Sequence, residues 1–139
     1  MKRLFLNILL MAFLCFACHK KEAVNLDYEI FENRFIEWGE LLNQKEDAYY
    51  AYIFSYACGY CQDIKKDVLS FAYQKENFYF VVYSKEIPII DSSISIIGEK
   101  DISKIGVVGT PTLLQIQDDK IKEYFVGSKQ ISEYLINNT

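Results

Sequence analysis

The sequence has little histidine, proline or tryptophan and no excess of positive charge. It contains one histidine, two prolines and one tryptophan among 139 residues. Lysine and arginine total 15 against 19 acidic residues, for a formal net charge of −4 at pH 7, and no stretch of the chain forms a basic patch. Because nucleic acids are bound largely through Lys and Arg contacts to phosphates, we expect no nucleic-acid partner.

The shortage of histidine and cysteine leaves few candidate metal ligands. The only histidine is His19, and two of the four cysteines, Cys58 and Cys61, lie close together. A structural zinc site needs four ligands, and this pair supplies two. Half of a zinc or copper site is therefore kept as an alternative interpretation, and we predict no metal and no bound cofactor.

The length and the apolar content limit the architecture. Hydrophobic residues make up 51% of the chain and charged residues 24%, a balance typical of globular proteins. A chain of 139 residues suits one compact domain. No internal repeat or low-complexity tract divides it. We expect a single folded domain and a monomeric protein.

The first 17 residues have the pattern of an export signal. Lys2 and Arg3 form a positive start, and the apolar stretch 4–17 follows, interrupted only by Asn7. This run is shorter than the about 20 apolar residues that a membrane-spanning helix needs, and it has the length of a secretory signal peptide. The alternative is a buried N-terminal helix, which the abruptly polar residues 19–22 disfavour. We predict a signal peptide over residues 1–17.

The end of this segment resembles the processing site of a bacterial lipoprotein. Cys18 follows the small residue Ala17, whereas Cys15 and Phe16 depart from the usual pattern. A simple secretory cut would fall at the same bond. Lipidation is preferred because a free N-terminal cysteine is a liability for an exported protein. We predict a lipid on Cys18, a tether over residues 18–25, and anchoring at the outer face of the bacterial cytoplasmic membrane or in the cell envelope.

On this interpretation, Cys58 and Cys61 are the two cysteines that remain free-standing in the folded domain. A structural disulfide usually closes a longer loop and stabilises the fold by doing so. A pair only three positions apart is better suited to being opened and closed. The pair is therefore a candidate redox-active disulfide.

Alternating apolar and amphipathic segments predict an α/β domain over residues 26–139. An amphipathic helix is expected over 26–44, followed by a strand over 48–55 that is buried on both faces. A one-faced helix then begins at the cysteine pair and leads to a second central strand over 78–83, which predicts a parallel strand pair. The remaining expected elements are a short helix near 101–105, strands over 112–117 and 121–126 joined by a hairpin, and a final helix capped by Ser128.

With these elements in place, the chain resembles the thioredoxin superfamily over roughly residues 45–137. The resemblance rests on the motif Cys58-Gly59-Tyr60-Cys61, directly after a central strand, and on Thr110-Pro111 at the start of a later strand. It implies a thioredoxin-like fold with a central mixed sheet of about four strands flanked by helices. It also implies that Pro111 is cis and that Thr110 and Pro111 lie beside the cysteines and support substrate binding.

Because the motif lies at the start of a helix, the two cysteines are expected to have different roles. The free N–H groups of the helix start and the positive end of its dipole stabilise a thiolate, so the pKa of Cys58 is expected to be lowered and Cys58 to attack the substrate. Cys61, one turn inside, is placed to resolve the mixed disulfide. Gly59 is expected to allow a tight entry to the helix and to leave Cys58 open to a large substrate. Tyr56 and Tyr60 flank the thiols, either as walls of a substrate groove or by chance in a tyrosine-rich chain.

Three positions depart from the thioredoxin pattern. Ala57 precedes the motif where thioredoxins usually have tryptophan, and Tyr52 stands where they often have a buried aspartate. Between the cysteines the motif has Gly-Tyr rather than Gly-Pro or Pro-His. Without a nearby acid or base, proton transfer at Cys61 relies on water or on a group that the sequence does not identify. The redox direction therefore stays open.

Together these features predict an extracytoplasmic thiol–disulfide oxidoreductase that exchanges disulfides with exported proteins. Its expected partners are exported protein thiols and disulfides, a membrane redox partner, and the membrane itself through the lipid anchor. The alternative is an accessory protein that keeps the fold, binds one exported client and has little general redox turnover. Turnover of a generic disulfide substrate distinguishes the two.

Overall fold

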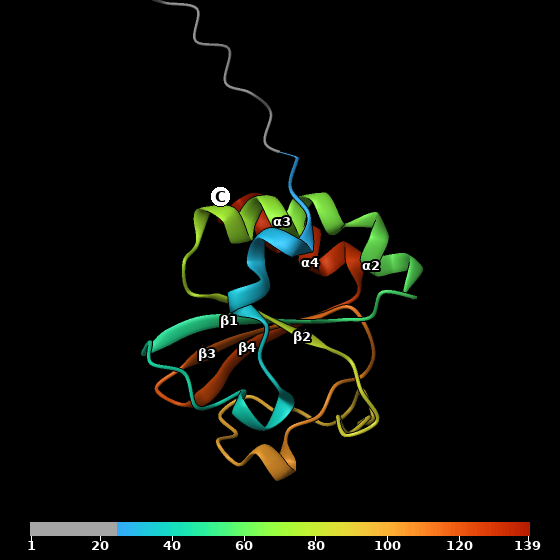
Figure 1. The fold of residues 1–139 in the computed structure, drawn as a ribbon. Coiled ribbons are helices and arrows are strands. Elements are labelled where there is room, and N and C mark those ends of the chain that lie inside the picture. The colour runs from blue at the N-terminus through green and yellow to red at the C-terminus, as the bar shows by residue number, and fades with distance from the viewer. Residues whose placement is uncertain (1–24) are drawn as a thin grey trace, which may run out of the picture.

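The computed structural model describes residues 25–139 and contains a four-stranded mixed sheet with a layer of chain on each face (Figure 1). The predicted signal peptide, Cys18 and nearly all of the tether lie outside the described residues. The strand order is β2-β1-β3-β4. The strands are β1 (Ala48–Phe54), β2 (Phe78–Val82), β3 (Thr112–Gln117) and β4 (Lys120–Val126). Within the described residues, no helix is both long and apolar enough to cross a membrane.

Helices cover one face of the sheet, and shorter elements cover the other. The α-helices α2 (Gly59–Asp63), α3 (Lys65–Gln74) and α4 (Ser128–Asn137) lie on one face together with the 3-10 helix η2 (Tyr28–Arg34). The opposite face carries the 3-10 helices η3 (Trp38–Glu40) and η4 (Ile102–Lys104) and much of the chain between β2 and β3. The expected α/β fold, with about four strands in a mixed sheet flanked by helices, is confirmed.

Strand β1 is the centre of the fold and ends just before the cysteine pair. It pairs in parallel with β2 and antiparallel with β3. Tyr52 and Phe54 belong to the core under the helices, whereas Ala51 and Ile53 belong to the core on the other face. Successive side chains of a strand point to opposite faces, so a strand covered on both sides must be apolar throughout. The prediction of a strand buried on both faces is confirmed.

The N-terminal segment differs from the single amphipathic helix expected over 26–44. The structure has the two short 3-10 helices η2 and η3, separated by extended chain at Phe35, which pairs with Phe80 of β2. The N–H of Ile36 donates to the carbonyl of Phe80 at 3.0 Å. Phe31 packs in the core under the helices and Trp38 in the core on the other face. One straight helix cannot reach both faces, so the chain passes around the edge of the sheet at residues 35–36.

The helix that follows the cysteines is divided in two. Ile64 has φ −105° and ψ 4° and separates α2 from α3, although the expected apolar side is buried throughout. The predicted parallel strand–helix–strand arrangement is confirmed, because β1 and β2 are parallel neighbours joined through these helices. The break leaves the cysteine pair at the start of a short first helix of five residues, with Cys58 as its N-cap and Cys61 inside it.

The C-terminal part contains the predicted hairpin and final helix. Asp118 and Asp119 both have positive φ, as a type I′ turn requires, and they connect β3 to β4. The helix begins differently from expectation: Gly127, with φ 83°, occupies the N-cap position, and no side chain caps the helix there. Ser128 is the first helical residue. The side-chain oxygen of Gln130 instead accepts the N–H of Val126 at 3.2 Å.

In the irregular segment between β2 and β3, the backbone around Pro88 lies close to the backbone around Gly106. Ile89 and Val107 form an isolated parallel bridge, and the N–H of Val107 donates to the carbonyl of Pro88 at 2.9 Å. A Cβ atom at Gly106 would lie 2.6 Å from Cγ2 of Ile90 and 2.7 Å from the Pro88 oxygen. Only glycine fits this approach without displacing its neighbours. The segment then leads directly into residues 109–111, which approach the cysteine pair.

Candidate active site

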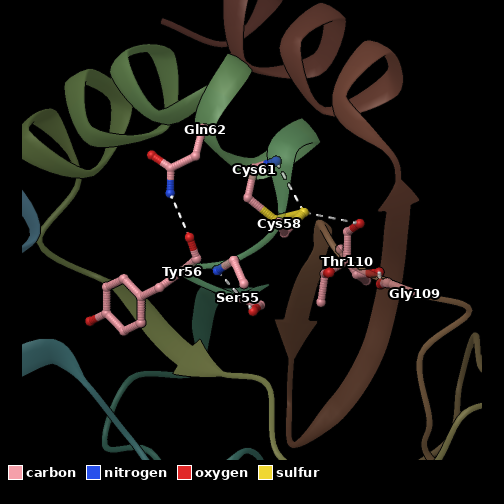
Figure 2. Close-up of a disulfide and its surroundings, with 9 residues drawn as sticks. Ser55, Tyr56, Cys58, Cys61, Gln62, Gly109 and Thr110 are labelled. Carbon is pink, nitrogen blue, oxygen red and sulfur yellow. Dashed lines mark hydrogen bonds between the residues drawn. A yellow bond between two sulfur atoms is a disulfide. The ribbon is translucent and has the colours of Figure 1, made fainter.

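Cys58 occupies the turn between β1 and α2 and caps the helix with its own sulfur. Its backbone is extended at the N-cap position, and the N–H of Cys61 donates to its Sγ atom at 3.2 Å (Figure 2). The turn is closed by two further bonds, from the N–H of Cys58 to the carbonyl of Ser55 at 3.1 Å and from the N–H of Ala57 to the Ser55 hydroxyl at 3.3 Å. These bonds position Cys58 where the strand ends and the helix begins.

Cys58 and Cys61 form a disulfide, and their Cα atoms are 5.2 Å apart. Their environments differ, because Cys58 is partly exposed whereas Cys61 has no exposed surface. Cys61 belongs to the core under the helices, and Cys58 packs against that core from outside. A partner molecule therefore reaches the Cys58 sulfur more easily than the Cys61 sulfur.

The turn at residues 109–112 lies against this disulfide. The carbonyl oxygen of Thr110 is 3.5 Å from the Cys58 sulfur (Figure 2). The Thr110–Pro111 peptide bond is cis. The hydroxyl of Thr112 donates to the carbonyl of Gly109 at 2.7 Å, and the N–H of Gly127 donates to the carbonyl of Pro111 at 2.9 Å. The last bond connects the turn to the start of α4, so three separate parts of the chain meet at the disulfide.

Of the two polar neighbours of the Cys58 sulfur, one favours the charged thiolate and the other favours the neutral thiol. The N–H of Cys61 carries partial positive charge and stabilises a thiolate. The carbonyl oxygen of Thr110 carries partial negative charge and favours a thiol, which can donate its S–H to that oxygen. In the disulfide, the sulfur has no hydrogen to donate. The site thus holds one partner for each protonation state of a reduced Cys58.

Gly59 and Tyr60, between the cysteines, are both part of α2. A Cβ atom at Gly59 would meet no atom within 4 Å, and its φ is not positive. The expectation that glycine is what allows the tight entry to the helix is therefore wrong, because residues with a side chain readily adopt a negative φ at the first position of a helix. What Gly59 provides is open space beside Cys58. Tyr60 is 68% exposed and lines a shallow groove of 330 Å³ with Val126 and Gly127.

Tyr56 lies on the other side of the disulfide from this groove. Its ring points away from the two sulfurs (Figure 2) and packs edge-on against Phe54 and Tyr28, with ring centroids 5.1 Å and 5.8 Å away. Its carbonyl accepts a hydrogen bond of 3.2 Å from the side-chain amide of Gln62. Tyr56 and Tyr60 therefore face different hollows of the surface.

The interior beside the site contains two tyrosine hydroxyls without partners. Tyr52 and Tyr28 are buried, and among the described residues neither hydroxyl has a hydrogen-bond partner. Burial strongly raises the pKa of both hydroxyls, so both stay protonated beyond the pH at which a free tyrosine ionises. Tyr52 is thus a neutral phenol at the position where thioredoxins often have a buried aspartate. Its hydroxyl does not replace the carboxylate that is missing at this position.

Sequence reasoning did not find Tyr28, Gln62 or the Gly109–Thr112 hydrogen bond. Tyr28 belongs to an N-terminal segment whose path around the sheet edge was not predicted, and no motif marked it. Gln62 directly follows the motif, and its position was the available signal. In the part of the chain that the structure covers, no group of three or more His, Cys, Asp or Glu side chains is placed to hold a metal ion.

Comparison with known proteins supports the fold. No known family model matches the chain, and no curated protein sequence matches it. Solved thioredoxin structures do match. Mitochondrial thioredoxin 3 from Saccharomyces cerevisiae has a TM-score of 0.50 and 16% identity, over 76% of this chain and 93% of that one. Thioredoxin NaTrxh from Nicotiana alata has a TM-score of 0.50 and 19% identity, over 76% and 89%.

The thioredoxin pre-protein of Schistosoma mansoni is a third such structure, with a TM-score of 0.50 and 15% identity, over 75% of this chain and 97% of that one. At these identities the likeness establishes the fold. The chain therefore has the thioredoxin fold, with a Cys58–Cys61 disulfide at the end of its central strand. The chemistry of the site is argued from its own geometry.

Proposed function

We propose that the protein is a thiol–disulfide oxidoreductase that exchanges disulfides with exported protein substrates through Cys58 and Cys61. The observation that carries the proposal is the asymmetry of the pair: Cys58 is partly exposed at the start of α2, and Cys61 is buried one turn inside. A disulfide with one accessible and one protected sulfur suits exchange, because the accessible sulfur meets the substrate and the protected one resolves the product.

The reductive reaction begins with both cysteines reduced. The Cys58 thiolate attacks one sulfur of a substrate disulfide, the substrate S–S bond breaks, and the released substrate thiolate takes up a proton. Cys61 then loses its proton and attacks the Cys58 sulfur. This forms the Cys58–Cys61 disulfide and releases the second substrate sulfur as a thiolate, which is protonated in turn. The substrate gains two electrons and two protons, and the protein loses them.

The same steps in reverse oxidise a substrate dithiol. A substrate thiolate attacks the Cys58 sulfur, Cys61 leaves as a thiolate, and the second substrate thiol displaces Cys58. Either direction needs a second redox partner to restore the starting state of the pair, and for an anchored protein this partner belongs in the membrane. The site needs no cofactor beyond its own disulfide. The protein acts as a monomer in this proposal.

Thr110 and Pro111 support the bound substrate in this proposal. They come within reach of Cys58 through the 3.5 Å contact between the Thr110 oxygen and the Cys58 sulfur. An extended substrate segment lying across this turn would place its cysteine over Cys58. Gly59 leaves the approach open, and Tyr60 forms one wall of the adjoining groove.

The location is part of the proposal. The export signal over residues 1–17 and the lipid on Cys18 would place the domain on the outer face of a bacterial membrane, tethered by residues 18–25. The support for this comes from the positively charged start, the apolar run and the Ala17-Cys18 junction of the sequence. In that compartment disulfides form and persist.

Reduction of a generic protein disulfide tests the activity. The full chain in detergent, with Cys15→Ser and Cys18→Ser so that two cysteines remain, is reduced and mixed with oxidised insulin. We expect insulin reduction that Cys58→Ser abolishes. Cys61→Ser should accumulate a mixed disulfide with the substrate, visible by non-reducing electrophoresis and mass spectrometry.

Two results would count against the proposal. Absence of exchange with insulin and with small disulfides would favour an accessory protein that binds one exported client. Full activity of Cys58→Ser would place the chemistry elsewhere in the molecule.

A further inference from the structure

A second hollow lies beside Tyr56, in the turn that leads from β1 to Cys58. It has a volume of 420 Å³ and lies between η2, the turn after β1, and the start of α3. Tyr56, two positions before Cys58, forms part of its wall. Gln62, which directly follows Cys61, lines it too and donates a hydrogen bond of 3.2 Å to the Tyr56 carbonyl. Neither cysteine lines the hollow, but two of its residues, Tyr56 and Gln62, flank the reactive pair in the chain.

Aromatic faces and a cation already meet at this hollow. Tyr28 and Tyr56 both line it and pack edge-on at 5.8 Å. The ammonium of Lys65 lies 4.9 Å from the centre of the Tyr28 ring and makes an ion pair of 2.9 Å with Asp27. A positive charge over a tyrosine face is attracted by the ring quadrupole. The walls thus bind a cation of the protein's own chain through an aromatic ring and a carboxylate.

Two further carboxylates at the hollow have no cation of their own. Glu29 and Glu32 line it and are exposed, and neither makes an ion pair among the residues that the structure describes. The nearby cation Arg34 is already used, because its guanidinium donates to the carbonyls of Ala72 and Lys75 at 2.7 Å and 2.9 Å.

With Asp27 included, three carboxylates face one ammonium, that of Lys65. The excess charge at the hollow is negative, which disfavours an anionic ligand and favours a cationic one.

We propose that this hollow binds an arginine side chain of the polypeptide substrate, carried close in sequence to the cysteine that reacts with Cys58. Arginine fits better than lysine because its planar guanidinium stacks on an aromatic face and donates to carboxylates in pairs. Tyr56 supplies an exposed ring, and Glu29 and Glu32 supply the acceptors. The inference rests on the proposed exchange activity and adds a preference of that activity for a class of substrate.

The experiment compares peptides that differ in one side chain. Each peptide carries a single cysteine as a mixed disulfide with 5-thio-2-nitrobenzoate, and a neighbouring position holds arginine, lysine, citrulline or glutamate. The reduced full chain with Cys15→Ser and Cys18→Ser releases the coloured thiolate when Cys58 attacks. We expect the arginine peptide to react about tenfold faster than its neutral isostere citrulline, with lysine between them, and the difference to shrink at high salt.

Matched variants separate the hollow from a general charge effect. Glu29→Gln combined with Glu32→Gln should remove most of the preference for arginine over citrulline. Glu76→Gln combined with Glu133→Gln changes the net charge equally at exposed positions outside the hollow and should leave the preference intact. Tyr56→Phe should keep the preference, whereas Tyr56→Leu should reduce it, because only the former retains an aromatic face.

Measuring peptide binding without disulfide exchange distinguishes a failure of this inference from a failure of the proposed exchange activity. Peptides with serine in place of cysteine are titrated into the oxidised protein, and amide shifts of residues 27–32 and Tyr56 are followed by NMR. Shifts that require arginine support the hollow as its site, whether or not exchange occurs. Equal rates for arginine and citrulline with normal exchange, or an absence of arginine-dependent shifts, would overturn this inference. Failure of every peptide to react would instead count against the exchange activity.

Discussion

The sulfur of Cys58 lies 3.5 Å from the carbonyl oxygen of Thr110, although the two residues are 52 positions apart in the chain. The contact exists because the chain between β2 and β3 returns to the end of β1, where Cys58 caps the first helix. A second neighbour, the N–H of Cys61, approaches the same sulfur at 3.2 Å. The fold therefore presents one sulfur, held between a donor and an acceptor, to the outside.

The first prediction concerns the unequal reactivity of the two thiols. Once the disulfide is reduced, Cys58 should be alkylated by iodoacetamide about tenfold faster than Cys61 at pH 7, because Cys58 is accessible and receives an N–H donor while Cys61 is buried. Quenched labelling followed by peptide mass spectrometry measures both rates. In urea the two rates should converge, which is the control. Faster labelling of Cys61 in the folded protein would reverse the assigned roles.

The second prediction concerns export. The mature protein from bacterial membranes should begin at Cys18 and carry a lipid on that residue, because the Lys2-Arg3 start, the apolar run and Ala17 fit a processed lipoprotein. Intact-mass spectrometry of the membrane fraction checks it. Cys18→Ser should move the domain out of that fraction or leave it unprocessed. A native protein that starts at Met1, or that has an unmodified Cys18, would show this prediction to be wrong.

Much of the fold could be predicted because its central elements have simple local patterns. Uncharged apolar runs marked β1 and β2, and the short polar link at Asp118-Asp119 marked the hairpin. The Cys-x-x-Cys motif after a strand and the later Thr110-Pro111 identified residues that the structure places together. The strand and hairpin signals lie within a few residues, so no knowledge of tertiary packing was needed for them, whereas the placement of Thr110-Pro111 beside the cysteines followed from the resemblance to the thioredoxin superfamily.

The parts that could not be predicted depend on tertiary packing. Apolar residues three or four positions apart in 26–44 fit a helix, but Phe31 and Trp38 pack on opposite faces of the sheet. Periodicity alone does not distinguish these cases. The hollow beside Tyr56 was missed for the same reason, since Tyr28 reaches it only through that path around the sheet edge. The break at Ile64 also left no sequence signal.

The third prediction concerns Gly106, whose backbone lies close to Pro88 and Ile90 in the irregular segment between β2 and β3. Gly106→Ala should lower the free energy of unfolding by about 1–3 kcal/mol, because its new methyl group would overlap Ile90 and the Pro88 carbonyl. Gly39→Ala is the matched control, since a Cβ there meets no atom within 4 Å, and it should be nearly neutral. Urea denaturation monitored by circular dichroism measures both. Equal stability of the two variants would contradict the close approach at Gly106.

The fourth prediction is a loss of stability in alkali. Burial raises the pKa of Tyr49 to about 12, and burial together with a hydrogen bond to Glu46 raises the pKa of Tyr79 to about 12. Above pH 10 the unfolded chain releases these protons while the folded protein keeps them, so stability falls as the pH rises. The stabilising contribution of these two tyrosines is fully present below pH 10. Each tyrosine contributes a slope of up to about 1.4 kcal/mol per pH unit, until the pH passes the folded pKa.

Urea unfolding of the oxidised protein between pH 8 and pH 11 measures this slope, and phenolate absorbance reports the ionisation directly. Tyr79→Phe should make the slope shallower, because one of the contributing groups is then absent. An unfolding free energy that stays constant from pH 9 to pH 11 would contradict the raised pKa values.

The last prediction compares two buried tyrosines of β1 that differ in one respect. The hydroxyl of Tyr49 donates to the carbonyl of Leu41 at 2.9 Å, whereas the hydroxyl of Tyr52 has no partner among the described residues. Tyr49→Phe should lower the free energy of unfolding by about 1 kcal/mol, since it removes a hydrogen bond and leaves the Leu41 carbonyl unpaired. Tyr52→Phe removes only a hydroxyl whose burial without a partner destabilises the folded state. It should leave the free energy of unfolding unchanged or raise it by about 1 kcal/mol.

Urea denaturation gives both stabilities, and insulin reduction by the same variants gives a second measurement. Because Tyr52 remains protonated at neutral pH, its hydroxyl is a donor and not a base, and Tyr52→Phe should leave the pH profile of insulin reduction unchanged. Destabilisation by Tyr52→Phe equal to that of Tyr49→Phe would mean that the Tyr52 hydroxyl has a bonding partner in solution. A shifted pH profile with unchanged stability would instead identify Tyr52 as a positioning residue for the proton of Cys61, because burial alone would not produce that shift.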